Sequence, residues 1–239
     1  MKAAVAIVLL SLASTAMAAD PLVRVPFVGC PSGGQMGLQS APKSGKDRWL
    51  KGKIAAQLAY YSPGDIGVLA PRGWHCSAVY GSSGAGMIVA PDKRTAEAFR
   101  RLDRVPVRGP FVWAGDSFGG TSGRGSVMEA IARYFPTHRD FIQKVRELDL
   151  LFQRLPSGPY SHDVVRQRTR ESVRFTTPAW DTGEGVGAGS LIAPGARPVE
   201  GIRKLVGPRE EPDLWGVDVR LPAGQIDVTE AILSEALRR

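Results

Sequence analysis

The sequence predicts an α+β fold, a single compact domain with a small mixed or antiparallel sheet, about five to six helices and one disulfide. Segments with helical and with strand periodicity are interspersed, without the regular strand-helix-strand rhythm of a doubly wound sheet. Hydrophobic residues make up 43% of the chain and charged residues 23%, which is the ordinary balance of a globular protein. We therefore expect one buried core over residues 20–239.

The first third of the chain predicts one helix and three strands. Residues 47–61 place apolar side chains at helical spacing, and Pro63-Gly64 ends that helix. Short apolar runs then alternate with glycine-containing turns, which is typical of a β meander. These runs span 66–70, 76–80 and 87–90.

Capping residues and apolar periodicity place helices in the middle of the chain. Asp92 can cap one helix, and Ser126 with Glu129 forms a capping box that opens another. A third helix follows from an apolar face that includes Phe141 and Val145. The predicted helices span 94–102, 126–135 and 139–155, and the predicted strands between them span 105–107 and 111–114.

The last third predicts two helices and two strands. Ser161 can cap a short basic helix, and Asp227 with Glu230 can cap the last helix. The predicted helices span 161–168 and 229–237, and the predicted strands span 173–176 and 214–221.

Residues 1–19 have the pattern of a secretory signal peptide. Lys2 precedes an apolar run over 3–13, and Ala16-Met17-Ala18 offers small residues at the positions that a signal peptidase recognises. The run is shorter than the ~20 apolar residues that span a bilayer as a helix. We expect cleavage near Ala18 or Ala19 and a periplasmic or secreted protein with no transmembrane segment.

Two cysteines, Cys30 and Cys76, allow one intramolecular pairing, and an exported protein matures where disulfides persist. The sequence therefore predicts a Cys30–Cys76 disulfide. Two alternatives remain open. Gly29 before Cys30 resembles the position of a lipidated cysteine, and His75 beside Cys76 would lower the pKa of a reactive thiol.

The chain is basic, with 31 Lys and Arg against 23 Asp and Glu, and this favours an anionic partner. Arginines gather over 94–108 and again over 166–174. The glycine-rich segment 119–126 opens into a predicted helix, whose free amides could hold an anion together with a basic side chain. The predicted anion-binding residues are Gly123, Arg124, Gly125 and Ser126.

Gly115-Asp116-Ser117-Phe118-Gly119 fits the nucleophile elbow of serine hydrolases, and it follows a predicted strand. A hydrolase would also need a histidine base, for which His75 and His138 are the candidates. Only 45 residues separate Ser117 from the last histidine, His162, which is too few for the partners of an α/β-hydrolase. The histidines and cysteines show no metal-ligand spacing, so we expect neither a metal nor a cofactor.

Together these patterns favour an exported binding protein over an enzyme. We expect an inhibitor-type, immunity-type or envelope-associated protein that recognises an acidic protein or an anionic envelope polymer, and no nucleic acid. The alternative is a small exported hydrolase that uses Ser117. A lipidated structural protein of the envelope is a third possibility.

Overall fold

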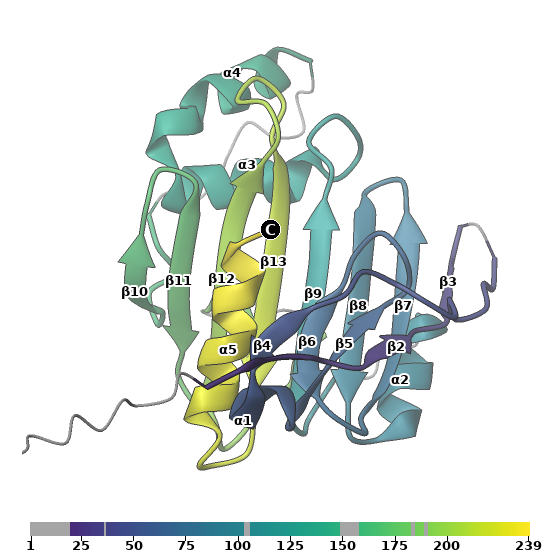
Figure 1. Ribbon diagram of the computed structural model, residues 1–239. Coiled ribbons are helices and arrows are strands. Elements are labelled where there is room, and N and C mark those ends of the chain that lie inside the picture. The colour runs from purple at the N-terminus through teal and green to yellow at the C-terminus, as the bar shows by residue number, and fades with distance from the viewer. Residues whose placement is uncertain (1–19, 36, 103–105, 149–157, 183–184, 189–190) are drawn as a thin grey trace, which may run out of the picture.

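The computed structural model describes residues 20–239 except 36, 103–105, 149–157, 183–184 and 189–190. The predicted signal peptide and the end of the predicted 139–155 helix therefore lie outside the described residues. In the described part, strands account for 36% of the structure and helices for 24%. An eight-stranded sheet dominates the molecule (Figure 1).

The strands are β1 (Leu22–Arg24), β2 (Phe27–Gly29), β3 (Ser32–Gly34), β4 (Trp49–Lys51), β5 (Leu58–Ser62), β6 (Val68–Pro71), β7 (His75–Gly81), β8 (Gly84–Ala90), β9 (Phe111–Ser117), β10 (Val164–Arg168), β11 (Ser172–Thr177), β12 (Val199–Val206) and β13 (Asp213–Arg220). The α-helices are α1 (Gly52–Ala55), α2 (Lys93–Arg100), α3 (Arg124–Tyr134), α4 (Arg139–Leu148) and α5 (Ile226–Leu237). The 3-10 turns in the described residues are η1 (Pro136–His138) and η3 (Val186–Ala188).

The large sheet has the order β10-β11-β12-β13-β9-β8-β7-β3. All its neighbours are antiparallel except β3 and β7, which are parallel. A second sheet, β2-β5-β6, and the pair β1-β4 complete the strands. Figure 1 shows α5 and the small sheet in front of the large sheet, with α2 and α3 behind it.

Alternation along β13 assigns its side chains to the two faces. Trp215 and Val217 are buried in a core shared with α5, β5 and β6. The other face packs against α3 and α4, where Leu205 joins a cluster that contains Met128 and Phe141. We call these the α5 face and the α3 face of the sheet.

The prediction of a small sheet is wrong, because an eight-stranded sheet is the main element, although the five described helices agree with the predicted number. Part of the error lies at 164–168, where the expected basic helix is the edge strand β10, paired with β11 from Val164 opposite Thr176. Its sequence, Val-Val-Arg-Gln-Arg, begins with β-branched residues that favour strands. Strand β12, which no pattern predicted, then pairs with both β11 and β13.

The expected helix over 47–61 is also wrong. That segment contains β4, the single-turn helix α1 and β5. All five residues of β5 are buried, and they pair with β2 on one side and β6 on the other. A continuous buried run suits a strand that is covered on both faces, whereas an amphipathic helix would leave polar residues on one side.

Other predictions are confirmed. Asp92 caps α2, since its carboxylate accepts hydrogen bonds from the amides of Arg94 and Thr95 at 3.3 and 3.1 Å. Strands form in all three segments of the predicted meander, as β6, β7 and β8, and helices form at α4 and α5. The meander itself is not formed, because β6 pairs with β5 in the small sheet, whereas β7 and β8 pair with each other in the large sheet. Ser126, however, does not cap α3, because that helix begins two residues earlier, at Arg124.

The Cys30–Cys76 disulfide is confirmed, with the two Cα atoms 5.3 Å apart. Cys30 directly follows β2 of the small sheet, and Cys76 lies in β7 of the large sheet. The bond therefore ties the two sheets together. It also leaves neither sulfur as a thiol for lipidation or catalysis.

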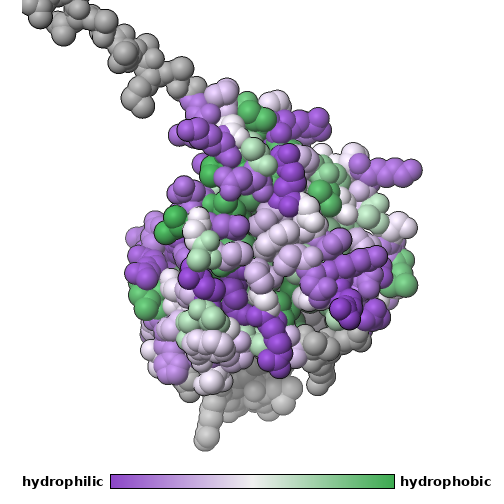
Figure 2. Space-filling model, turned by 90° about the horizontal axis from the view of Figure 1, so that it is seen from below, coloured by the Kyte–Doolittle hydropathy of each residue, from purple (hydrophilic) through white to green (hydrophobic). Residues whose placement is uncertain are grey.

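The end of the molecule seen in Figure 2 is mostly hydrophilic, and its hydrophobic residues form small separate spots among the coloured atoms. Within the described ranges, no helix combines the length and apolar character needed to cross a membrane.

Candidate functional site

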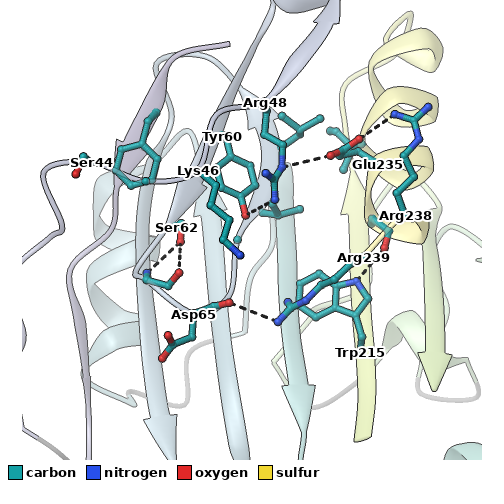
Figure 3. Close-up of a pocket in the computed structure, with 18 residues that line it drawn as sticks. Ser44, Lys46, Arg48, Tyr60, Ser62, Asp65, Trp215, Glu235, Arg238 and Arg239 are labelled. Carbon is teal, nitrogen blue, oxygen red and sulfur yellow. Dashed lines mark hydrogen bonds and ion pairs between the residues drawn. The ribbon is translucent and has the colours of Figure 1, made fainter. Parts of the chain in front are cut away.

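A pocket of about 390 Å³ lies on the α5 face, at the junction of the small sheet, β13 and the end of α5 (Figure 3). Five segments that are distant in sequence form it: strand β2, the loop before β4, strands β5 and β6 with the turn between them, strand β13, and α5 with the two residues after it. Its charged lining residues are Lys46, Arg48, Asp65, Glu235, Arg238 and Arg239. We call it the basic pocket.

Arg48 stands on one side of the basic pocket, between Tyr60 and Glu235 (Figure 3). Its guanidinium carbon lies 4.4 Å from the centre of the Tyr60 ring, and Nη2 donates a hydrogen bond to the Tyr60 hydroxyl at 3.3 Å. Its Nε lies 3.3 Å from Glu235 Oε1. Stacking on an aromatic face stabilises a cation by ~0.5–2 kcal/mol, so Tyr60 and Glu235 together fix the Arg48 side chain.

Glu235 is shared by two cations. Besides Arg48, it accepts a hydrogen bond from Arg238 Nη1 at 3.0 Å, which turns Arg238 back along α5 (Figure 3). One carboxylate therefore neutralises only part of the charge of two guanidinium groups.

Arg239 forms the opposite side of the pocket. Its guanidinium carbon lies 4.0 Å from the centre of the Trp215 ring, and Nη2 donates to the Asp65 carbonyl at 3.5 Å. The nearest carboxylate oxygen, Asp116 Oδ2, is 3.8 Å away. Burial raises the pKa of Asp116 above its ordinary value.

Lys46 extends towards the middle of the pocket from the loop before β4 (Figure 3). It is exposed, and it forms no ion pair with another described residue. Counting side chains, the lining carries four cations against the two carboxylates of Asp65 and Glu235. The basic pocket thus has a net positive charge, with Lys46 and Arg239 as its least compensated donors.

Glycines provide the space in which the aromatic residues lie. A Cβ atom on Gly67 would lie 2.3 Å from the Tyr60 hydroxyl, and one on Gly45 would lie 2.1 Å from the Phe27 ring. Trp215 is 1% exposed, and its indole nitrogen donates to the Ala236 carbonyl at 3.2 Å. The aromatic residues of the pocket are therefore closely packed, whereas Lys46 is exposed to solvent.

The predicted anion-binding residues lie elsewhere, at the start of α3. The amides of Arg124 and Ser126 donate to the carbonyls of Thr121 and Gly123 at 3.1 and 3.0 Å. Gly123 has a packing role as well, because a Cβ there would lie 2.0 Å from the Ser83 carbonyl oxygen. Gly125 is the next residue of the same helical turn. An anion site at 123–126 stays a prediction.

The hydrolase candidates are not brought together. Ser117 ends β9 and, with Ser126, lines a second pocket, on the α3 face. His75 begins β7, where it is opposite Ala90, whereas Ser117 is opposite Gly84 at the other end of β8. That offset of six residues amounts to ~20 Å along the sheet. His138 is buried in η1 with Nδ1 3.1 Å from the Thr137 hydroxyl, and neither histidine lines the pocket that holds Ser117.

The described residues contain no cluster of His, Cys, Asp and Glu suited to a metal ion. The lysine and arginine side chains of the basic pocket can donate charge-assisted hydrogen bonds to a carboxylate or phosphate group. The residues that line the basic pocket were not predicted from the sequence, because they are separated by almost 200 residues and the arginine-rich stretches pointed to other segments.

No family model matches this chain, and neither the curated proteins nor the solved structures compared with it give a match.

Proposed function

We propose that this chain is an exported, disulfide-stabilised binding protein that holds an acidic group of its partner in the basic pocket. The observation that carries the proposal is the convergence of Lys46, Arg48, Arg238 and Arg239 on one pocket with two carboxylates. A volume of about 390 Å³ suits a single carboxylate or phosphate group with its linker, while the rest of a larger partner lies outside.

Export is supported by the pattern of residues 1–19 and by the disulfide, since disulfides persist in oxidising compartments. In the periplasm or outside the cell, acidic proteins and anionic envelope polymers are the available macromolecular anions. The partner class follows from charge, and an inhibitor or immunity role is one form that such binding takes.

A binding titration tests this proposal. Hexaglutamate and hexaglutamine peptides have the same length and differ in charge, so calorimetry at low salt should show binding of hexaglutamate alone. Lys46→Glu should weaken hexaglutamate binding about tenfold, which is ~1.4 kcal/mol. The loss should shrink at 0.5 M NaCl, because salt screens exposed charges.

The matched control is Lys144→Glu, which makes the same charge change at an exposed position on α4. Hexaglutamate affinity should stay within about twofold of the wild type there. Equal losses in both variants would mean that overall charge, and not the pocket, attracts the peptide, and would contradict the proposal. Short-chain polyphosphate as a second probe separates a phosphate polymer from an acidic protein as the preferred partner.

The hydrolase alternative has less support, because neither candidate histidine lies beside Ser117. Stoichiometric labelling of Ser117 by a fluorophosphonate probe, abolished by Ser117→Ala, would reverse that ranking.

A further inference from the structure

The second pocket, on the α3 face, differs from the basic pocket in its construction. It encloses about 420 Å³ between the sheet, α3 and the segments that contain Tyr160, Val186 and Leu191. We call it the α3 pocket. Strands β9, β12 and β13 supply its floor, and α3 and the segments 160, 186 and 191–192 supply its sides.

The floor of the α3 pocket is flattened by glycines. Arg203, Gly216, Gly115 and Gly86 are successive partners across four strands. A Cβ on Gly115 would lie 2.7 Å from the Trp113 ring, and one on Gly216 would lie 3.1 Å from the Arg203 side chain. The missing side chains leave room for the Trp113 ring and the Arg203 guanidinium to lie along the sheet.

The charges on this floor neutralise each other. Arg203 donates to Asp218 through both terminal nitrogens, at 2.7 and 2.9 Å, and the two side chains are 12% and 4% exposed. Burial would lower the pKa of Arg203, but Asp218 raises it, so Arg203 remains a cation. The pair therefore presents no excess charge to a ligand.

The charged residues of α3 are neutralised in the same way. Arg133 Nε lies 3.2 Å from Glu129 Oε1, and its guanidinium carbon lies 3.6 Å from the centre of the Tyr160 ring. The Tyr160 hydroxyl donates to the same Glu129 oxygen at 2.5 Å. Each of the four ionised side chains that line the α3 pocket thus has an opposite partner within the lining.

The remaining walls are apolar and held in place. Ala130, Val186, Leu191, Ile192 and Leu214 face the cavity. The amide of Val107 donates to the Leu191 carbonyl at 2.8 Å, which fixes the 191–192 segment. The Val186 amide donates to Asp163 at 3.1 Å, and Asp163 in turn accepts from the Tyr134 hydroxyl at 3.0 Å.

We propose that the α3 pocket binds a small uncharged molecule with a flat apolar ring and a hydroxyl group. The ring would lie against Trp113 and the aliphatic walls, where burial of apolar area contributes ~25 cal/mol per Å². The hydroxyls of Ser117 and Ser126 line the same cavity and suit a neutral polar group. A charged ligand would lose its hydration without finding an uncompensated partner.

Three naphthalene derivatives of equal ring size test the charge preference. 1-Naphthol is uncharged at pH 7, 1-naphthalenesulfonate is an anion, and 1-naphthylmethylamine is a cation. Calorimetry should give the highest affinity for 1-naphthol, at least about fivefold above either ion. Saturating hexaglutamate should leave this binding unchanged, because the two pockets lie on opposite faces of the sheet.

A charge placed at the rim locates the site. Leu191 is 41% exposed, so Leu191→Lys should fold and should lower 1-naphthol affinity at least about tenfold. Leu38→Lys makes the same change at a leucine that is 75% exposed and does not line the pocket, and it should have no effect. Equal or tighter binding of 1-naphthalenesulfonate, or equal losses in the two variants, would overturn the proposal. So would binding of glucose in preference to 1-naphthol.

Discussion

The two faces of the large sheet carry pockets of similar volume, about 390 and 420 Å³. The two pockets differ in whether their charged side chains are paired and buried or in excess and exposed. In the α3 pocket the central ion pair is almost fully buried, and each charge has a partner. In the basic pocket the cations reach solvent, and they outnumber the carboxylates. A buried charge without a partner costs several kcal/mol, whereas an exposed one is hydrated. Excess charge suited to recognition is therefore found where solvent reaches it.

The largest expected difference between the two faces concerns their arginines. Arg203→Leu leaves Asp218 buried without a partner and should lower the free energy of unfolding by about 3–5 kcal/mol. Arg48→Leu on the α5 face, where the side chain is 28% exposed, should cost about 1 kcal/mol or less. Urea unfolding of both variants measures this contrast.

The double variant Arg203→Leu/Asp218→Leu is the control for the first change. It removes both charges and should regain most of the lost stability. If Arg203→Leu and Arg48→Leu lowered the free energy of unfolding equally, the charged residues on the two faces would not differ in burial and pairing as described.

Reduction of the disulfide should affect the α5 face more than the α3 face. Cys30–Cys76 closes a loop with a sequence separation of 46 and joins β2, whose Phe27 lines the basic pocket, to β7. Its loss should lower the unfolding free energy by roughly 4 kcal/mol and the melting temperature by roughly 10 °C. Calorimetry with and without reductant measures the total effect.

The two pockets can be compared in the same samples at a temperature where the protein with the reduced disulfide is still folded. Hexaglutamate binding should weaken on reduction, while 1-naphthol binding should persist. Loss of both to the same degree would mean that the disulfide supports the whole sheet and not the α5 face in particular.

A smaller effect is expected from acid. Arg174, on β11, donates to both carboxylate oxygens of Glu230 in α5, at 2.7 and 2.5 Å, and this bonding lowers the pKa of Glu230 below its ordinary value of 4.5. A lowered folded-state pKa gives stability that is present above pH 4.5 and is lost as the pH falls through the folded-state value. Glu230 is 47% exposed, so the contribution is small.

Glu230→Gln should therefore lower stability slightly at pH 7 and flatten the decrease towards pH 3. Glu171→Gln, an exposed acid in the turn before β11, is the matched control. An unchanged acid profile in Glu230→Gln would show that the Arg174 contact does not hold α5 to the sheet.

The sequence predicted elements better than their assembly. Local signals predicted the Asp92 cap, the strands β6, β7 and β8, and the disulfide, because each depends on adjacent residues or on a single possible pairing. They did not predict that β6 lies in a different sheet from β7 and β8. The extent of the sheet depends on β12, whose charged Arg203 and Lys204 obscure the strand pattern until both neighbours are present. The basic pocket could not be predicted, since Lys46 and Arg239 meet only after β2, β5 and α5 have packed.

Binding of an acidic group in the basic pocket can be followed directly through the tryptophan indole N–H signals in an NMR titration with hexaglutamate. Trp215 lies under Arg239 in the basic pocket, and Trp113 lies on the floor of the α3 pocket. We predict that the Trp215 signal shifts saturably while the Trp113 signal stays fixed, and that Lys46→Glu weakens the response. A shift of Trp113 alone, or no shift of Trp215 under conditions where the peptide binds, would contradict the assignment of the anionic partner to the basic pocket.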